Sequence, residues 1–168
     1  GRLVIDQQPF KPAEVIRGLS QDIASLSWGQ RVQIDDRLAN ADLLVQGDKE
    51  RFRQCVLNLL ENASKYSPDP KPITVLTSSD ADTFFLSVID QGPGIREEER
   101  EQIFLPFYRS AKNTNDVKGT GIGLAIVKLL MKRMGGDVRV LDSSDPGTCF
   151  QLSLAVYQPA LATVAASQ

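Results

Sequence analysis

The chain has 168 residues, of which 42% are hydrophobic and 24% are charged, and its formal net charge is −2. These proportions are typical of one globular domain whose core is large enough to need no disulfide or structural metal. The small net charge argues against binding to nucleic acid or a membrane surface through bulk charge, and no apolar run approaches the roughly 18 residues of a membrane span.

Histidine is absent from the sequence, and the two cysteines, Cys55 and Cys149, lie far apart. The lack of histidine excludes Ser-His-Asp and Cys-His catalysis and an HExxH zinc site, so proton chemistry would fall to carboxylates, lysine, tyrosine or water. We interpret the cysteines as buried apolar thiols in a reducing compartment. Because the chain starts with Gly1 and not with Met, we expect it to be a piece of a longer protein.

The first half of the chain is predicted to form a helix at about 13–26, strands at 31–35 and 43–46, and a long helix that begins after Asp48 and runs to about residue 66. Pro12 favours the start of the first helix because its fixed φ suits the first helical position. Asp48 can cap the long helix, and Ser67 followed by Pro68 ends it.

The second half is predicted to form a hairpin of strands at 73–77 and 84–89, a helix at about 121–134, and a final hairpin of strands at 138–141 and 149–156. Gly135 and Gly136 offer an easy left-handed cap for the helix. Residues 158–168 have no core pattern and are expected to fray, which leaves one domain at 1–157. Hairpins combined with three helices predict an α+β fold, a two-layer sandwich with helices on one face of a mixed sheet.

The long helix combines an apolar face with an unusual polar stripe. Its apolar face consists of Phe52, Val56, Leu59, Leu60 and Ala63, and its polar stripe of Asn58, Glu61, Asn62 and Lys65. A solvated surface is one interpretation of the stripe. However, asparagine is a poor helix former, and a face designed only for water would favour Glu, Lys or Arg. Amide oxygens are hard ligands that suit Mg²⁺, so a metal site is the other interpretation.

Two glycine-containing segments extend this pattern. The strand at 84–89 leads into Asp90 and then into Gly92-Pro93-Gly94, which is either an ordinary exit from a strand or a carboxylate held near a ligand. Such a carboxylate could accept a hydrogen bond from the exocyclic amine of adenine. The second segment, "KGTGIGLAIVK", places alternating glycines at a helix start, where free backbone amides bind phosphate. It matches neither a Walker loop nor a good Rossmann fingerprint.

Between these segments lie "IFLPFYRS" and a polar stretch at 110–118. The polar stretch has no apolar periodicity and is predicted to be a mobile lid. Phe104 and Phe107 are predicted to pack in the core and to anchor one end of that lid.

In this order the motifs resemble the ATP-binding catalytic domain of sensor histidine kinases, within the gyrase, Hsp90, histidine kinase and MutL superfamily. "NLLENASKYS" looks like the N box, "DQGPGI" the first glycine box, "FLPFYRS" the F box and "GTGIGLAIVK" the second glycine box. The resemblance covers about residues 3–156. It implies the Bergerat fold, with a mixed sheet of about five strands packed against three helices.

The resemblance also implies the roles of individual residues. Asn62 corresponds to the position that binds Mg²⁺, and Glu61 to the acidic position proposed to polarise the acceptor imidazole. Asp90 corresponds to the aspartate that reads adenine. The full implied ATP-binding set is Asn58, Asn62, Lys65, Tyr66, Asp90, Gly92, Gly94, Arg109, Lys118, Gly119, Thr120, Gly121, Gly123, Leu124 and Thr148.

The implied function is transfer of the γ-phosphoryl group of ATP, with Mg²⁺, to a histidine on a separate dimerisation domain. This chain has no histidine, so it cannot phosphorylate itself on one. The resemblance further implies a response regulator downstream, a homodimeric full-length protein and a cytoplasmic location, with or without a membrane anchor elsewhere in the protein. The alternatives are an anti-sigma-type serine kinase, a module that senses ATP without transfer, and a segment of a gyrase-like or Hsp90-like ATPase clamp.

Overall fold

The computed structural model describes residues 2–110, 119–143 and 146–159. Its elements are β1 (Gln8–Phe10), α1 (Pro12–Ile23), η1 (Gly29–Arg31), β2 (Val32–Asp36), β3 (Val45–Gly47), α2 (Lys49–Tyr66), β4 (Ile73–Ser79), β5 (Thr83–Asp90), η2 (Glu97–Glu99), η3 (Gln102–Phe104), α3 (Gly123–Arg133), β6 (Asp137–Leu141) and β7 (Thr148–Ala155). Within these ranges no helix has both the length and the apolar character needed to cross a membrane. Residues 111–118 of the lid predicted at 110–118, and most of the predicted tail, lie outside the described residues.

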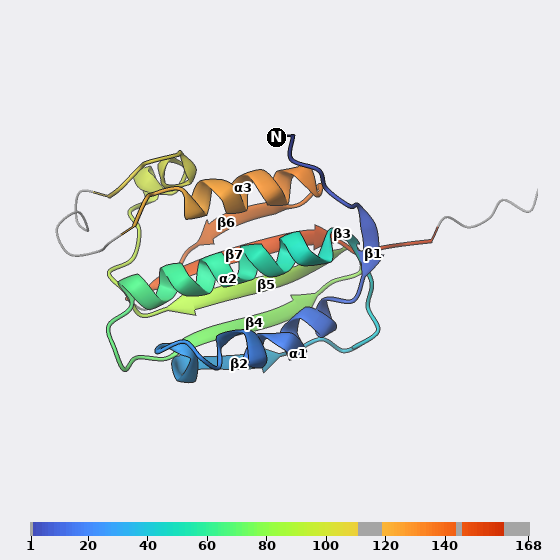
Figure 1. Ribbon diagram of the computed structural model, residues 1–168, viewed down its shortest axis with the longest axis horizontal. Coiled ribbons are helices and arrows are strands. Elements are labelled where there is room, and N and C mark those ends of the chain that lie inside the picture. The colour runs from blue at the N-terminus through green and yellow to red at the C-terminus, as the bar shows by residue number, and fades with distance from the viewer. Residues whose placement is uncertain (1, 111–118, 144–145, 160–168) are drawn as a thin grey trace, which may run out of the picture.

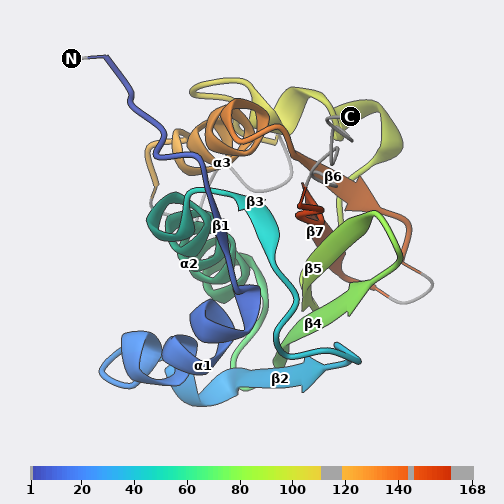
Figure 2. The ribbon, with the colours of Figure 1, turned by 90° about the vertical axis from the view of Figure 1, so that its right-hand side faces the viewer.

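The main sheet has five strands in the order β2-β4-β5-β7-β6. Strand β2 runs parallel to β4, while the β4–β5, β5–β7 and β7–β6 pairs are antiparallel, so the sheet is mixed. All three α-helices cover the same face of this sheet, as the two views show (Figures 1 and 2). The predicted α+β two-layer sandwich is therefore confirmed, and so are its two hairpins.

The core fills the space between the sheet and the helices. Alternate residues of β5 and β7 point into it, because successive side chains of a strand lie on opposite faces. These residues are Phe84, Leu86, Val88, Phe150, Leu152 and Leu154, each at most 1% exposed. The predicted apolar face of α2 packs against them, with the ring of Phe52 5.9 Å from that of Phe84. Because this face is fully committed to the core, the polar stripe of α2 must face elsewhere.

The ends of α2 follow the predicted signals. Asp48 caps the helix, and its Oδ1 accepts a hydrogen bond from the backbone N–H of Arg51 at 3.1 Å. The helix ends at Tyr66, and Ser67 has an extended backbone ahead of Pro68. A cap of this kind stabilises a helix by about 1 kcal/mol.

Several sequence-based boundaries were wrong for identifiable reasons. Helix α1 ends at Ile23 and not near residue 26, because Leu26 is 40% exposed and lies beyond the buried stripe of the helix. The strand predicted at 43–46 is β3, which begins at Val45 and pairs with β1 in a separate two-stranded sheet. Strand β1 was missed because three residues including Pro9 are too few for a periodic pattern.

The predicted core position of Phe107 was also wrong. Phe104 is buried as predicted, but the Phe107 side chain is 73% exposed. Its backbone has φ 64°, a left-handed conformation that a bulky residue adopts only when the surroundings impose it. Here its N–H donates to the carbonyl of Gly121 at 2.9 Å, so hydrogen bonding and not side-chain burial sets this position.

Candidate nucleotide-binding site

Two adjoining cavities lie between α2, the segment after η3 and the approach to α3. The outer cavity has a volume of about 210 Å³ and is lined by the polar stripe of α2 and by residues 119–121, 123 and 124. The inner cavity, of about 70 Å³, reaches the end of β5 at Asp90. The two share a wall formed by Asn62, Tyr66, Ile103, Tyr108, Arg109 and Leu124. One extended ligand could therefore occupy both.

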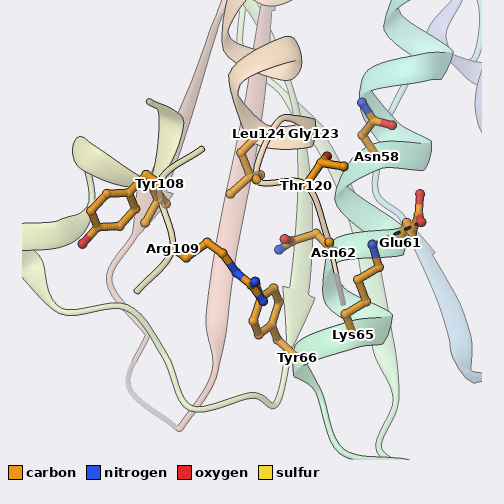
Figure 3. A pocket seen from close by; sticks show the side chains of 13 residues that line it. Asn58, Glu61, Asn62, Lys65, Tyr66, Tyr108, Arg109, Thr120, Gly123 and Leu124 are labelled. Atoms are coloured by element: carbon orange, nitrogen blue, oxygen red, sulfur yellow. Dashed lines mark ion pairs between the residues drawn. The ribbon is translucent and has the colours of Figure 1, made fainter. Parts of the chain in front are cut away.

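The polar stripe of α2 faces the outer cavity. Figure 3 shows the Asn62 amide directed into the cavity and Glu61 at its outer edge. Neither Asn58 nor Asn62 has a side-chain hydrogen-bond partner among the described residues. Their amides are thus available to a ligand.

Glu61 and Lys65 form an ion pair along the helix. The distance from Lys65 Nζ to Glu61 Oε1 is 3.4 Å, and the side chains are 38% and 56% exposed respectively. An exposed pair of this kind is worth about 0–1 kcal/mol, so either group can exchange its partner for a ligand at little cost. A Cβ atom added to Gly119 would lie 3.7 Å from Lys65 Nζ. The ammonium group therefore approaches the glycine segment on the other side of the cavity.

Asp90 closes the inner cavity and is only 3% exposed. Its Oδ1 accepts hydrogen bonds from the backbone N–H of Gly92 at 2.8 Å and of Thr148 at 3.2 Å. Burial raises the pKa of Asp90 above its ordinary value, and the two hydrogen bonds oppose that rise. The carboxyl group is thus fixed in direction by backbone atoms of two separate segments.

Gly92 allows the loop after β5 to lie against the end of α2. A Cβ atom at this position would come within 2.8 Å of the Tyr66 carbonyl oxygen and 3.1 Å of Asp90 Oδ1. The neighbouring N–H of Gln91 donates to Ser67 Oγ at 3.1 Å. Tyr66 and Ser67, at the end of α2, thereby position the loop that follows Asp90.

The start of α3 is defined by Gly121. Its φ of 71° is not helical, and the helix begins at Gly123 and not at residue 121 as predicted. A Cβ atom on Gly121 would approach Phe107 Cα to 3.0 Å. The F box and the second glycine box therefore lie in direct backbone contact, with the first turn of α3 beside the outer cavity.

The structure brings nearly all of the predicted site residues together. The predicted residues that line one or both cavities are Asn58, Glu61, Asn62, Lys65, Tyr66, Asp90, Gly94, Arg109, Gly119, Thr120, Gly121, Gly123, Leu124 and Thr148. Gly92 is not among the lining residues, but its backbone N–H donates to Asp90, which lines the inner cavity. Lys118 falls outside the described residues.

Sequence reasoning missed the apolar part of the lining. Ile103 and Tyr108 line both cavities, and Pro93, Ile95 and Phe150 line the inner one. The available signal was that Pro93 and Ile95 lie within the first glycine box and that Ile103 and Tyr108 lie within "IFLPFYRS". A flat aromatic base would pack against these side chains while Asp90 accepted its hydrogen bond.

Fold and site together define a class of protein. A five-stranded mixed sheet carries three helices on one face (Figure 1). The two cavities lie between α2 and the approach to α3 (Figure 3). A buried carboxylate lies at one end and amides with a glycine-rich helix start at the other. This is the ATP-binding Bergerat architecture.

Comparison with known proteins agrees with this class. Residues 47–158 match the model of the family described as histidine kinase-, DNA gyrase B-, and HSP90-like ATPase. Adaptive-response sensory kinase SasA of Prochlorococcus marinus is 34% identical over 146 residues, which are 86% of this chain and 37% of the relative. The chain thus spans about a third of the length of the curated relatives that it matches.

Solved structures give the same result. The mycobacterial sensor histidine kinase MprB has a TM-score of 0.72 and 31% identity, with coverage of 89% of this chain and 97% of that one. A complex of histidine kinase ThkA with response regulator protein TrrA shares the fold, with a TM-score of 0.74, 23% identity, and coverage of 92% of this chain and 43% of that one.

The chain belongs to the histidine kinase-, DNA gyrase B- and HSP90-like ATPase family. The prediction that it is the ATP-binding catalytic domain of a sensor histidine kinase is confirmed. MprB and ThkA are named as histidine kinases, so the anti-sigma-type serine kinase is not favoured.

Proposed function

We propose that this chain binds ATP with Mg²⁺ and transfers the γ-phosphoryl group to a histidine on a separate dimerisation domain of the same protein. The observation that carries the proposal is the polar stripe of α2, which faces the glycine segment before α3 across a cavity that continues to a buried aspartate. Because the chain contains no histidine, the acceptor has to lie outside it.

Adenine occupies the inner cavity in this proposal. Its exocyclic amine donates to Asp90, while guanine presents a carbonyl oxygen there and would face the carboxylate with no proton between them. Gly94 and Thr148 line the cavity beside Asp90, and Tyr66 and Leu124 line its passage to the outer cavity. A hydrogen bond to a charged group contributes about 1.5–3 kcal/mol, which is enough to select between the two bases.

The phosphates occupy the outer cavity. Backbone N–H groups at the start of α3 are free to donate there, as at other helix N-termini that bind phosphate. Gly119, Thr120, Gly121 and Gly123 line this part of the cavity, with Arg109 and Lys65 supplying positive charge. Lys118 precedes these residues and is proposed as a further cation on sequence grounds alone.

Mg²⁺ fits the donor set of α2. Among the described residues, no group of three or more His, Cys, Asp or Glu side chains is placed to hold a metal ion. In this proposal the metal is held mainly by oxygens of the nucleotide and by water. Mg²⁺ is usually bound in this way, with one or two protein oxygens. Asn62 would supply such an oxygen, with Asn58 beside it, and the ion would neutralise charge on the transferred group.

Glu61 is proposed as the base that polarises the acceptor imidazole. Its side chain is 56% exposed at the outer edge of the cavity, where a second domain could reach it. Its carboxylate lies 3.4 Å from Lys65 Nζ, and both residues line the outer cavity in which the phosphates are proposed to bind. The remaining proposals follow from the family: a homodimeric full-length kinase in the cytoplasm, a catalytic domain at 1–157, and a response regulator as the downstream partner. ThkA, which shares the fold, was solved in complex with response regulator protein TrrA.

Phosphotransfer in trans tests the function. The chain is mixed with a histidine-bearing dimerisation domain and with ATP labelled at the γ-phosphate, in the presence and absence of Mg²⁺. The expected result is acid-labile label on histidine of the added domain that depends on the metal. Binding of ATP with no transfer to any dimerisation domain of the full-length protein would instead indicate an ATP-sensing module.

A further inference from the structure

Glu99 is a buried carboxylate that the proposed nucleotide contacts do not include. It is the last residue of η2, and its side chain is only 6% exposed. Its Oε2 accepts from Arg96 Nε at 3.1 Å, and its Oε1 accepts from Tyr108 Oη and Ser110 Oγ, each at 2.9 Å. Three side-chain donors thus converge on one carboxylate.

Two of these donors flank Arg109, which lines both cavities. Figure 3 shows the Arg109 side chain extending into the space that Tyr66 and Asn62 also line, while the Tyr108 hydroxyl points away from it. Glu99 therefore holds the residues immediately before and after the arginine. A backbone hydrogen bond from Tyr108 N–H to the Leu105 carbonyl, at 3.2 Å, fixes the same segment from the other side.

The negative charge of Glu99 strengthens its hydrogen bonds with Arg96, Tyr108 and Ser110. Hydrogen bonds to an ionised carboxylate are roughly twice as strong as neutral ones. Hydrogen bonds from Arg96, Ser110 and Tyr108 lower the pKa of Glu99 to about 2, so the carboxylate stays ionised at neutral pH. Removing the charge would leave two hydroxyl groups and a guanidinium competing for a weaker acceptor.

We propose that Glu99 is a positioning residue that directs Arg109 toward the phosphates of the nucleotide through the hydroxyl groups of Tyr108 and Ser110. This inference rests on the proposed function, because it takes Arg109 to act on phosphate. A group held in place before binding contributes more affinity than one that must be ordered by the ligand. In this proposal Glu99 holds Arg109 in place before the nucleotide binds, without contacting the nucleotide itself.

The first arm of the test compares ligands with and without phosphate. Glu99→Gln keeps the size of the side chain and removes its charge. We expect roughly tenfold weaker binding of ATP and a change of less than about twofold for adenosine, both measured by calorimetry. Glu98→Gln is the matched control, because the Glu98 side chain is 71% exposed and its Oε1 lies 3.9 Å from Arg96 Nη1, too far for a hydrogen bond. It should bind both ligands as the unmodified chain does.

The second arm is a double-mutant cycle with Arg109→Ala. If Glu99 acts through the arginine, Glu99→Gln should not weaken ATP binding further once Arg109 is gone. Tyr108→Phe keeps the Glu99 carboxylate and removes one of its hydrogen-bond donors, so it should weaken ATP binding by roughly two- to threefold. This variant replaces Glu99→Gln in the test if Glu99→Gln folds poorly. Merely structural roles for Glu99 and Tyr108 would weaken adenosine as much as ATP, and would do so whether or not Arg109 is present.

The outcomes separate this inference from the proposed function. In a chain that binds ATP, equal losses for ATP and adenosine, additive losses in the cycle, or no effect of Arg109→Ala would each overturn the role of Glu99 alone. Failure of the unmodified chain to bind ATP would overturn the proposed function and this inference with it.

Discussion

The two ends of the site are built in opposite ways. Asp90, at the inner end, is 3% exposed, and backbone N–H groups of two segments fix its direction. At the outer end, Glu61 is 56% exposed, its one ion pair is with Lys65, and the amides of the stripe have no side-chain hydrogen-bond partner among the described residues. The inner end already has its hydrogen bonds in place, whereas in the proposed function the outer end is completed by the ligand, its metal and a second domain.

This difference predicts how the two ends respond to substitution. Changes at the outer end should alter metal dependence and transfer while leaving folding intact, because those side chains contribute little to packing. Changes at the inner end should alter base selection and stability together, because the same backbone contacts serve both.

The largest effect is expected at Asn62. Asn62→Ala should remove the Mg²⁺ dependence of ATP binding and reduce transfer to below detection, because a ligand of the ground-state metal contributes to both. Calorimetry with and without Mg²⁺ and transfer to a dimerisation domain in trans measure the two effects. Asn40→Ala is the control, since Asn40 lies in the loop before β3 and, within the described part of the chain, its side chain accepts only from Asp42 N–H. Metal-dependent binding that survives in Asn62→Ala would assign the metal to other residues.

Glu61 should separate transfer from binding. We expect Glu61→Gln to leave ATP affinity near that of the unmodified chain and to slow transfer by roughly a hundredfold, because a general base acts only when the imidazole attacks. Single-turnover transfer rates at saturating ATP provide the measurement. A loss of ATP affinity as large as that of Asn62→Ala would place Glu61 among the metal or nucleotide ligands.

The inner end is tested by base selection. Asp90→Asn should weaken ATP by roughly ten- to a hundredfold and reduce the preference for ATP over GTP, because the amide no longer offers a charged acceptor. Calorimetric titrations with both nucleotides give the ratio. The control is Asp82→Asn, at an exposed position in the turn between β4 and β5. Similar affinities for ATP and GTP in the unmodified chain would contradict the role of Asp90.

Two glycine-to-alanine substitutions test the backbone contacts at the inner end. Gly92→Ala places a Cβ atom 2.8 Å from the Tyr66 carbonyl oxygen, so the loop must shift; we expect a loss of about 1–3 kcal/mol in the free energy of unfolding and weaker ATP binding. Gly18→Ala is the matched control, because it lies within α1 with no atom within 4 Å of the added Cβ. It should stabilise the protein by about 0.5–1 kcal/mol. Denaturant unfolding of both variants measures the difference.

Sequence periodicity was sufficient where one segment determines its own structure. The two faces of α2 follow from apolar residues at three- and four-residue steps, and the cap at Asp48 is a local hydrogen bond. The hairpins β4–β5 and β6–β7 likewise join neighbours in the chain. In each case the interactions that decide the structure are between residues close in sequence.

Contacts between distant segments were not predictable in the same way. Phe107 is a large apolar residue of the kind that usually packs in a core. Its side chain is nevertheless exposed, and its backbone N–H donates to the carbonyl of Gly121. Glu99 belongs to the run Arg96-Glu97-Glu98-Glu99-Arg100, which is typical of a solvated surface, and only the folded structure brings Tyr108 and Ser110 to it. The pairing of the α2 stripe with residues 119–124 was expected from the family resemblance and not from any periodicity.

The smallest expected effect concerns acid stability, and it compares Glu99 with its exposed neighbour. The pKa of Glu99 is about 2 in the folded chain and has an ordinary value of 4.5, so the folded state favours the ionised form. This contribution to stability is fully present above pH 4.5 and is lost as the pH falls from 4.5 toward 2. Thermal midpoints measured between about pH 7 and about pH 3 should therefore fall less steeply for Glu99→Gln than for the unmodified chain, while Glu98→Gln should retain the original slope. Glu99→Gln should also be the less stable protein at neutral pH, because the two curves differ by the contribution that acid removes. Parallel curves for Glu99→Gln and the unmodified chain would mean that the carboxylate is not held in its ionised form by its three donors.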